Sequence, residues 1–261
     1  MARVTTHREG YEMEFQQNVD KLTQLKLTGM LEDYRLGHGD PAVEALSFDQ
    51  RFGRAIDSQV HHTELRRFQN LQRKAKLKQR EACVEGIDYT ASRGLNRSLM
   101  GSLNACSWVD KANNIVITGP TGTGKSYLAC ALGNQCLRRG LSVLYLRLPR
   151  ILEAIMVARA DGSLSALRLS YAKPRVLIVD DFGLSATTHQ ESADLLEVIE
   201  DRYDSGSLIM SSQVPYVDWL NYIDDPTVAD AILDRVMHRA HRIELRGESM
   251  RKLYNSVRED V

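Results

Sequence analysis

Eight consecutive residues, Gly119–Ser126, have the composition and spacing of a phosphate-binding loop. Glycines allow the backbone to turn so that successive N–H groups surround a phosphate, and the N-terminus of a following helix adds partial positive charge. In such a loop Lys125 reaches the β- and γ-phosphates, and the hydroxyl of Ser126 is a ligand of Mg²⁺. We therefore predict a nucleoside triphosphate site formed by Gly119, Pro120, Thr121, Gly122, Thr123, Gly124, Lys125, Ser126 and the next residue, Tyr127.

An acidic motif follows the apolar run Val176–Val179. Asp180 is placed to hold the Mg²⁺ shell, and Asp181 could polarise the attacking water. A further predicted strand, Val143–Leu146, lies between this motif and the phosphate-binding loop. This order argues against a Ras-like arrangement or a small-molecule kinase and favours an ATPase with an additional strand.

Three further polar positions are candidates for contact with the γ-phosphate. Gln213, with Ser212 beside it, ends a predicted strand and could contact the γ-phosphate or the water, although a polar strand end before Pro215 is also plausible. Arg235 is the preferred arginine finger, an arginine that reaches the γ-phosphate of a neighbouring subunit, with Arg239 as the alternative. Arg251 could sense nucleotide within its own subunit, but solvated surface arginines remain an open alternative for these positions. The predicted catalytic set is Lys125, Asp181, Gln213 and Arg235.

The tripeptide Asp181-Phe182-Gly183 also occurs in protein kinases, which raises a second interpretation of this motif. A kinase would need His-Arg-Asp upstream and a glycine-rich strand loop. None of the His-Arg pairs in this chain is followed by Asp. The kinase interpretation therefore fails.

Short apolar runs alternate with helical segments from Asn114 onward, which predicts a parallel α/β sheet with helices on both faces. The five predicted strands are Ile115–Thr118, Val143–Leu146, Val176–Val179, Leu208–Ser211 and Arg242–Leu245. The predicted helices are Lys125–Arg138, Arg150–Ala158, Gln190–Tyr203 and Val228–His238, the third with a capping box at Thr188.

The first third of the chain has helical periodicity instead. Asp40-Pro41 resembles an N-cap with a first-turn proline, and Ser47–Gln50 has the form of a capping box. An apolar stripe of Phe48, Phe52, Ile56 and Val60 follows, and a further helix is predicted over Thr63–Arg80. We predict a helical domain over residues 1–84 that binds DNA or a partner, and an ATPase domain over residues 85–261.

Bulk composition excludes several classes of protein. Lys+Arg and Asp+Glu are both 34, but the excess of cations lies between Leu65 and Asp110, and the excess of acids precedes it. The four cysteines lack metal-site spacing, and no histidine lies at ligand spacing with a partner, so no zinc site or disulfide framework is predicted. The chain also shows no apolar segment of membrane-span length and no signal peptide. A cytoplasmic protein is expected.

With these motifs identified, the segment Gly119–Arg251 resembles the AAA+ core of the IstB-like ATPases, which are related to the DnaC helicase loader. The resemblance rests on Gly119–Ser126, Val176–Gly183, Ile199–Tyr203, Met210–Pro215 with Trp219, Asp234-Arg235 and Gly247–Arg251. Upstream, Leu25–Met30 resembles the start of the family's helical N-terminal domain. Asp181 departs from the pattern, because many AAA+ proteins carry glutamate there.

The resemblance implies an ATP- and Mg²⁺-dependent protein that binds and deforms duplex DNA as a homo-oligomer with ATP-bridged interfaces. It also implies an IstA-type transposase as partner, with no membrane involvement. Seven cations without an intervening acid could contact DNA phosphates: Arg66, Arg67, Arg73, Lys74, Lys76, Lys78 and Arg80. A solvated basic helix face is the simpler alternative for them.

Two other functions remain open at this point. In a helicase loader of the DnaC type the N-terminal helices would bind a helicase, and single-stranded DNA would be preferred. In a DNA-coating protein the nucleotide site would have decayed, but Lys125, Ser126, Asp180 and Asp181 are all present. The segment Gly94–Trp108 is the expected wall of the adenine pocket.

Overall fold

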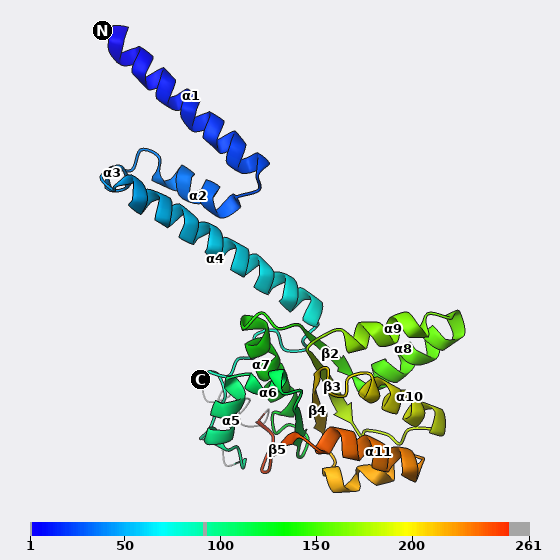
Figure 1. The fold of residues 1–261 in the computed structure, drawn as a ribbon. Coiled ribbons are helices and arrows are strands. Elements are labelled where there is room, and N and C mark those ends of the chain that lie inside the picture. The colour runs from blue at the N-terminus through cyan, green and yellow to red at the C-terminus, as the bar shows by residue number, and fades with distance from the viewer. Residues whose placement is uncertain (1, 91–92, 251–261) are drawn as a thin grey trace, which may run out of the picture. The chain divides into compact units, whose positions relative to one another are not determined.

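The computed structural model describes residues 2–90 and 93–250 and divides the chain into two compact units, Met1–Asn70 and Leu71–Val261 (Figure 1). This division lies earlier in the chain than the predicted boundary after residue 84. The reason is that Ala75, Leu77 and Ala82 are almost completely buried and belong to the second unit. Among the described residues, no helix is both long and apolar enough to cross a membrane.

The first unit is helical, as predicted. Its helices are α1 (Ala2–Gln24), α2 (Thr28–Gly37), α3 (Pro41–Glu44) and α4 (Phe48–Ala75), the last of which ends inside the second unit. Both predicted helix starts are confirmed. The Asp40 side chain accepts a hydrogen bond from the Ala42 N–H, and Ser47 and Gln50 form the reciprocal capping box.

Helix α2 crosses α4 at Gly29. The Ser58 hydroxyl donates to the Gly29 carbonyl at 2.9 Å, and the Gly29 N–H donates to Gln59 Oε1 at 3.0 Å. A Cβ atom at Gly29 would clash with the Ser58 backbone, so this close crossing requires glycine. The apolar stripe predicted on α4 is present, but its four side chains are 41–70% exposed.

Helix α4 differs from the prediction over Thr63–Arg80. It is one continuous helix from Phe48 and ends at Ala75, where Lys76 takes a positive φ of 54°. Leu77 is then 4% exposed, so the chain leaves the helix to bury this side chain. The last three predicted basic positions, Lys76, Lys78 and Arg80, consequently lie beyond the helix.

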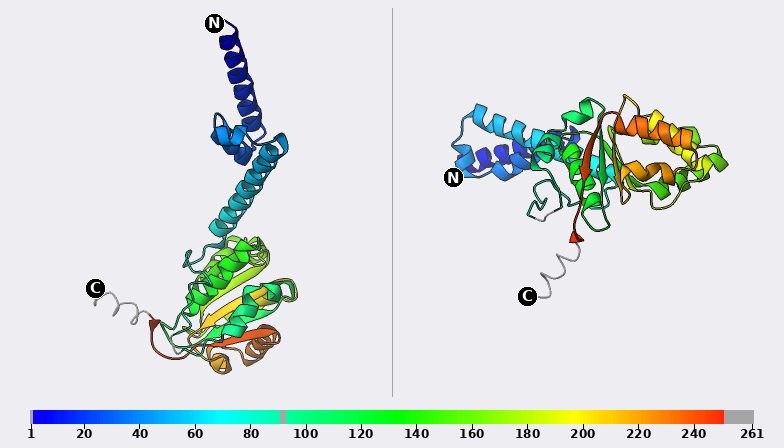
Figure 2. Two further views of the ribbon diagram at one scale, coloured as in Figure 1. Left: turned by 90° about the vertical axis from the view of Figure 1, so that its left-hand side faces the viewer. Right: turned by 90° about the horizontal axis from the view of Figure 1, so that it is seen from below.

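The second unit contains a five-stranded parallel sheet in the order β2-β3-β4-β1-β5. Figure 2 draws the chain from two further directions. All five predicted strands are confirmed: β1 (Asn114–Thr118), β2 (Val143–Arg147), β3 (Val176–Phe182), β4 (Ser207–Ser212) and β5 (Ala240–Glu244). The helices and the 3₁₀ helix η1 are α5 (Arg97–Asn104), α6 (Ser107–Asp110), α7 (Lys125–Arg138), α8 (Leu148–Asp161), α9 (Leu164–Ala172), α10 (His189–Glu200), η1 (Tyr216–Tyr222) and α11 (Pro226–Met237).

Helices cover both faces of this sheet. On one face, α7 packs so closely that Gly133 lies against the side chain of Ile178 on β3. On the other face, Leu177 and Val179 join a buried cluster with α8, α10 and α11. Because successive strand residues point to opposite faces, β3 is buried on both sides, which explains its uninterrupted apolar sequence. Since the strands are parallel, the C-terminal ends of β1 and β3 lie at the same edge of the sheet.

Candidate nucleotide-binding site

The phosphate-binding loop connects β1 to α7, as the motif predicts. Gly119, Gly122 and Gly124 all have positive φ values, of 147°, 87° and 98°. A Cβ atom at Gly119 would collide with the Leu245 carbonyl, and one at Gly124 would lie 2.7 Å from the Arg93 guanidinium. The glycines are therefore required both for the turn and for close approach of neighbouring chain segments.

Lys125 is 8% exposed at the start of α7. Its ammonium donates to the carbonyls of Gly119 and Pro120, at 2.7 and 2.8 Å. These bonds hold the lysine inside the loop that would surround the phosphates. A lysine held there supplies positive charge together with the N-terminus of α7.

Asp180 lies at the end of β3, with its side chain 1% exposed. Its Oδ2 accepts hydrogen bonds from Ser126 Oγ at 2.8 Å and from the Tyr145 hydroxyl at 2.5 Å, and its Oδ1 accepts one from Ser211. Burial opposes ionisation, but the hydrogen bonds from Ser211, Tyr145 and Ser126, with the charge of Lys78, outweigh it and lower the pKa of Asp180. The carboxylate therefore stays ionised.

A magnesium ion fits this donor set. The Ser126 hydroxyl and the Asp180 carboxylate lie within hydrogen-bond distance of each other beside the phosphate-binding loop, and oxygen donors of this kind are the ligands Mg²⁺ prefers. When bound, the ion would neutralise charge that develops on the phosphates.

Asp181 occupies an irregular position in β3. Its φ is 63°, in the left-handed region, and the register between β3 and β4 shifts between Val179 and Phe182. Its side chain is 17% exposed, and Oδ2 accepts a hydrogen bond from Arg147 Nε at 2.5 Å. The second carboxylate of the acidic motif is thus turned away from Asp180 and paired with a cation at the end of β2.

Gln213 follows β4 and lies at the phosphate-binding loop. Its Oε1 accepts a hydrogen bond from the Thr121 hydroxyl at 2.5 Å. Ser212, the other candidate, instead donates to the Phe182 carbonyl at 2.8 Å and accepts from the Val214 N–H. Of the two, Gln213 is the residue that lies beside the loop.

These groups surround an open cleft of about 540 Å³, a volume suited to a small-molecule ligand. Its described lining residues are Lys78, Gln79, Gly86, Asp88, Arg93, Thr121, Gly122, Gly124, Lys125, Ser126, Tyr127, Asp181, Gln213 and Met250. The expected adenine wall, Gly94–Trp108, contributes none of them. Met100, Leu103 and Trp108 in that segment are buried core residues, and the cleft is lined instead by residues of the earlier segment between Lys78 and Arg93.

The comparison with known families agrees with this site. A family described as IstB-like ATP binding protein matches residues 20–257. The chain belongs to this IstB-like ATP-binding family. The insertion sequence ATP-binding protein y4pL of Sinorhizobium fredii (strain NBRC 101917 / NGR234) is 41% identical to it, over 90% of this chain and 95% of that protein.

Solved structures support an AAA+ fold for the IstB-like chain. AMPPCP-bound DnaA from Aquifex aeolicus matches with a TM-score of 0.54 and 19% identity, over 69% of this chain and 55% of that chain. The DnaC helicase loader matches with a TM-score of 0.51 and 14% identity, over 63% of this chain and 96% of that chain. At these identities the likeness establishes the fold alone.

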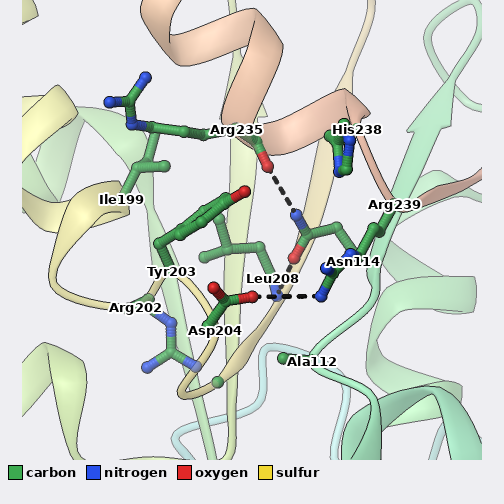
Figure 3. A pocket seen from close by; sticks show the side chains of 11 residues that line it. Ala112, Asn114, Ile199, Arg202, Tyr203, Asp204, Leu208, Arg235, His238 and Arg239 are labelled. Carbon is green, nitrogen blue, oxygen red and sulfur yellow. Dashed lines mark hydrogen bonds and ion pairs between the residues drawn. The ribbon is translucent and has the colours of Figure 1, made fainter.

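The arginines predicted to act between subunits lie at the opposite end of the strands. Arg235 and Arg239 are among the residues that line a small pocket there, which Figure 3 shows. The Arg235 carbonyl accepts a hydrogen bond from the side-chain amide of Asn114, the first residue of β1, whereas the Arg235 guanidinium points away from Asn114. The Arg235 side chain pairs with Glu200, and Arg239 pairs with Asp204 at 3.1 Å. Neither arginine lines the cleft of its own chain, and Arg251 lies outside the described residues.

The predicted DNA-contacting cations separate into two groups. Arg66, Arg67, Arg73 and Lys74 lie on α4 with exposed side chains. Because positions seven apart lie two helical turns apart, Arg66 aligns with Arg73, and Arg67 aligns with Lys74, on one face. Lys76 and Arg80 are exposed beyond the helix, and Lys78 lines the nucleotide cleft.

Several residues at the site were not predicted from the sequence, among them Tyr145, Arg147 and Arg93. Tyr145 and Arg147 lie on β2 and contact the two carboxylates, which follows from the pairing of β2 with β3. The sequence signal that could have identified them is the pair of polar side chains near the end of β2, the strand that precedes β3 and its two aspartates. Arg93 is 5% exposed and donates to the carbonyls of Thr123, at 3.0 Å, and Asp88, at 2.6 Å, but no local motif marks it.

Proposed function

We propose that this chain is an ATP-hydrolysing transposition helper that assembles on duplex DNA and presents it to an IstA-type transposase. The family match carries this proposal, because it includes both the nucleotide site and most of the helical unit, residues 20–257. The name of the 41%-identical relative, an insertion sequence ATP-binding protein, points in the same direction.

The nucleotide site supports hydrolysis. In this scheme Lys125 binds the β- and γ-phosphates, and Ser126 and Asp180 hold Mg²⁺. Asp181 orients a water molecule and accepts its proton as the water oxygen bonds to the γ-phosphorus. The bond from that phosphorus to the bridging oxygen breaks, and ADP and phosphate are released. Gln213 contributes to positioning from the end of β4.

The proposal of assembly rests on the positions of the phosphate-binding loop and of the predicted arginine finger. The phosphate-binding loop lies at the C-terminal ends of the strands, and Arg235 lies where β1 begins. An arginine finger from Arg235 would therefore have to act on the nucleotide of a second copy. Bound ATP would then bridge two subunits, and hydrolysis would disassemble the oligomer.

Phosphate contacts by α4 would hold the duplex. The aligned cations Arg66, Arg67, Arg73 and Lys74 can neutralise DNA phosphates without reading base sequence. Such contacts suit a helper that binds many target sequences.

The deciding experiment measures duplex binding and assembly by size-exclusion chromatography and filter retention, with ATP, ADP or no nucleotide. Lys125→Ala is the matched control. ATP-dependent assembly on duplex DNA, absent in Lys125→Ala, followed by stimulation of the transposase, is the expected result. Duplex binding that is indifferent to nucleotide, with no phosphate release, would instead indicate a DNA-coating protein.

The second candidate function is a helicase loader, favoured by the fold similarity to the DnaC helicase loader. A loader would prefer single-stranded DNA and would co-purify with a replicative helicase. The same binding measurements, repeated on single strands, distinguish the two functions.

A further inference from the structure

The segment that follows α4 brings one of its lysines to the nucleotide cleft. Lys78 Nζ lies 3.9 Å from Asp180 Oδ2, and the Lys78 side chain is 42% exposed. It lines the same cleft as Lys125 and Ser126. The run of cations from Arg66 to Arg80, which the sequence predicts to contact DNA, therefore includes one lysine, Lys78, that lies at the nucleotide cleft.

The backbone on both sides of Lys78 is attached to α7, the helix that begins at the phosphate-binding loop. Leu77 is 4% exposed and lies against Gly133. Asn134 Nδ2 donates to the carbonyls of Arg80 and Ala82, at 2.8 and 2.7 Å. The backbone position of Lys78 is consequently held by buried contacts, even though its side chain reaches into solvent.

Asp180 does not depend on Lys78 as a hydrogen-bond partner. Its carboxylate already accepts three hydrogen bonds, from Ser126, Tyr145 and Ser211, and a separation of 3.9 Å exceeds hydrogen-bond distance. The ammonium therefore retains donors that can be directed into the cleft. A Mg²⁺–ATP complex held by Ser126 and Asp180 would keep a net negative charge, which a nearby ammonium would attract.

We propose that Lys78 is a second phosphate-binding lysine, which binds the terminal phosphate of a nucleoside triphosphate and so distinguishes ATP from ADP. This inference rests on the nucleotide site of the proposed function. Lys125 binds both nucleotides through the β-phosphate that they share, in addition to the γ-phosphate of ATP, whereas Lys78 acts only on the triphosphate. Since α4 ends at Ala75, the state of the nucleotide is detected three residues beyond the end of that helix.

The test compares Lys78→Ala with Lys78→Arg, which keeps the charge, and with Lys173→Ala, an exposed lysine directly after α9 that is not among the described residues lining the cleft. The full chain is titrated with a fluorescent AMPPCP derivative and with ADP, both with Mg²⁺. Loss of one charge-assisted hydrogen bond should weaken AMPPCP binding by Lys78→Ala by about 10- to 100-fold. ADP binding should change by less than about twofold, with Lys78→Arg near wild type and Lys173→Ala unchanged.

Two results would overturn the inference. Equal losses for both nucleotides would assign Lys78 to the integrity of the site, and thermal unfolding without nucleotide would then show a matching loss of stability. Unchanged affinity for both, with weaker nucleotide-free binding to duplex DNA, would assign Lys78 to DNA. Lys125→Ala is measured in parallel. If it binds AMPPCP normally, the nucleotide site itself is wrong, which is distinct from a failure at Lys78 alone.

Discussion

Removal of the Arg147 guanidinium should accelerate basal ATP hydrolysis, if Asp181 is the residue that orients the attacking water. Arg147 Nε lies 2.5 Å from Asp181 Oδ2, so this pairing competes with a water molecule for that oxygen and fixes the orientation of the carboxylate. The Arg147 side chain is 48% exposed, and solvent screening limits such a pair to about 0.5–1 kcal/mol. We therefore expect Arg147→Ala to raise the steady-state turnover number by about two- to fivefold.

The assay is phosphate release at saturating ATP, with ATP affinity measured separately. Arg150→Ala is the matched control, because Arg150 pairs with Glu153 on α8 and touches neither carboxylate of the acidic motif. Its turnover number should stay at the wild-type value. A fall of Arg147→Ala to the level of Asp181→Asn would refute the reasoning, since it would mean that Arg147 holds Asp181 in its active orientation.

Three other outcomes are expected. Asp181→Asn should bind ATP normally but lose phosphate release and remain assembled on DNA, as chromatography with ATP would show; normal turnover would remove Asp181 from the mechanism. Gly119→Ala should lose at least about 2 kcal/mol of unfolding free energy, because its φ of 147° is strained for alanine and the added methyl group meets Leu245. In denaturant titrations, a stability equal to wild type would contradict this clash. Replacing Arg66, Arg67, Arg73 and Lys74 with glutamine should lower the slope of log affinity against log salt for duplex DNA by about 3–4. An unchanged slope would place the DNA elsewhere.

The α/β unit was predictable because its strands have two buried faces. Each strand is an apolar run, and each run is followed by a helical segment or a turn, so strand number and sheet type follow from pattern. The short helices α5 and α9 were missed. The α9 N-cap residue, Ser163, makes no side-chain hydrogen bond to the helix. Helix α5 does have an N-cap at Asn96, whose side chain accepts a hydrogen bond from the Leu99 N–H, but it is only eight residues long.

The end of α4 could not be predicted for a different reason. The run of lysines and arginines after Thr63 has good helix propensity throughout. What ends the helix is burial of Leu77 beneath Gly133, a residue of the phosphate-binding helix far along the chain. Tertiary packing therefore overrides local preference at this point, and it moves Lys78 from a helix face to the cleft.

The site residues that belong to a contiguous sequence motif were predicted. Those that reach the site only through the pairing of strands or the packing of distant segments were missed. Gly119–Ser126 and Asp180 are contiguous signals, and both lie where the motifs require. Tyr145 and Arg147 become part of the site only because β2 pairs with β3. Arg93 enters it through a close approach to Gly124 that no local spacing encodes.

Helix α7 contacts both the phosphate-binding loop and the segment that carries Lys78. Helix α7 begins at Lys125, and at its middle Gly133 and Asn134 hold the segment from Leu77 to Ala82. An α-helix of this length behaves as a stiff element, since each turn is hydrogen-bonded to the next. We expect a displacement of its N-terminus to move the segment from Leu77 to Ala82 as well, because that segment packs on α7. Within the second unit, one packed helix and a few buried contacts therefore link the phosphate-binding loop to the segment from Leu77 to Ala82.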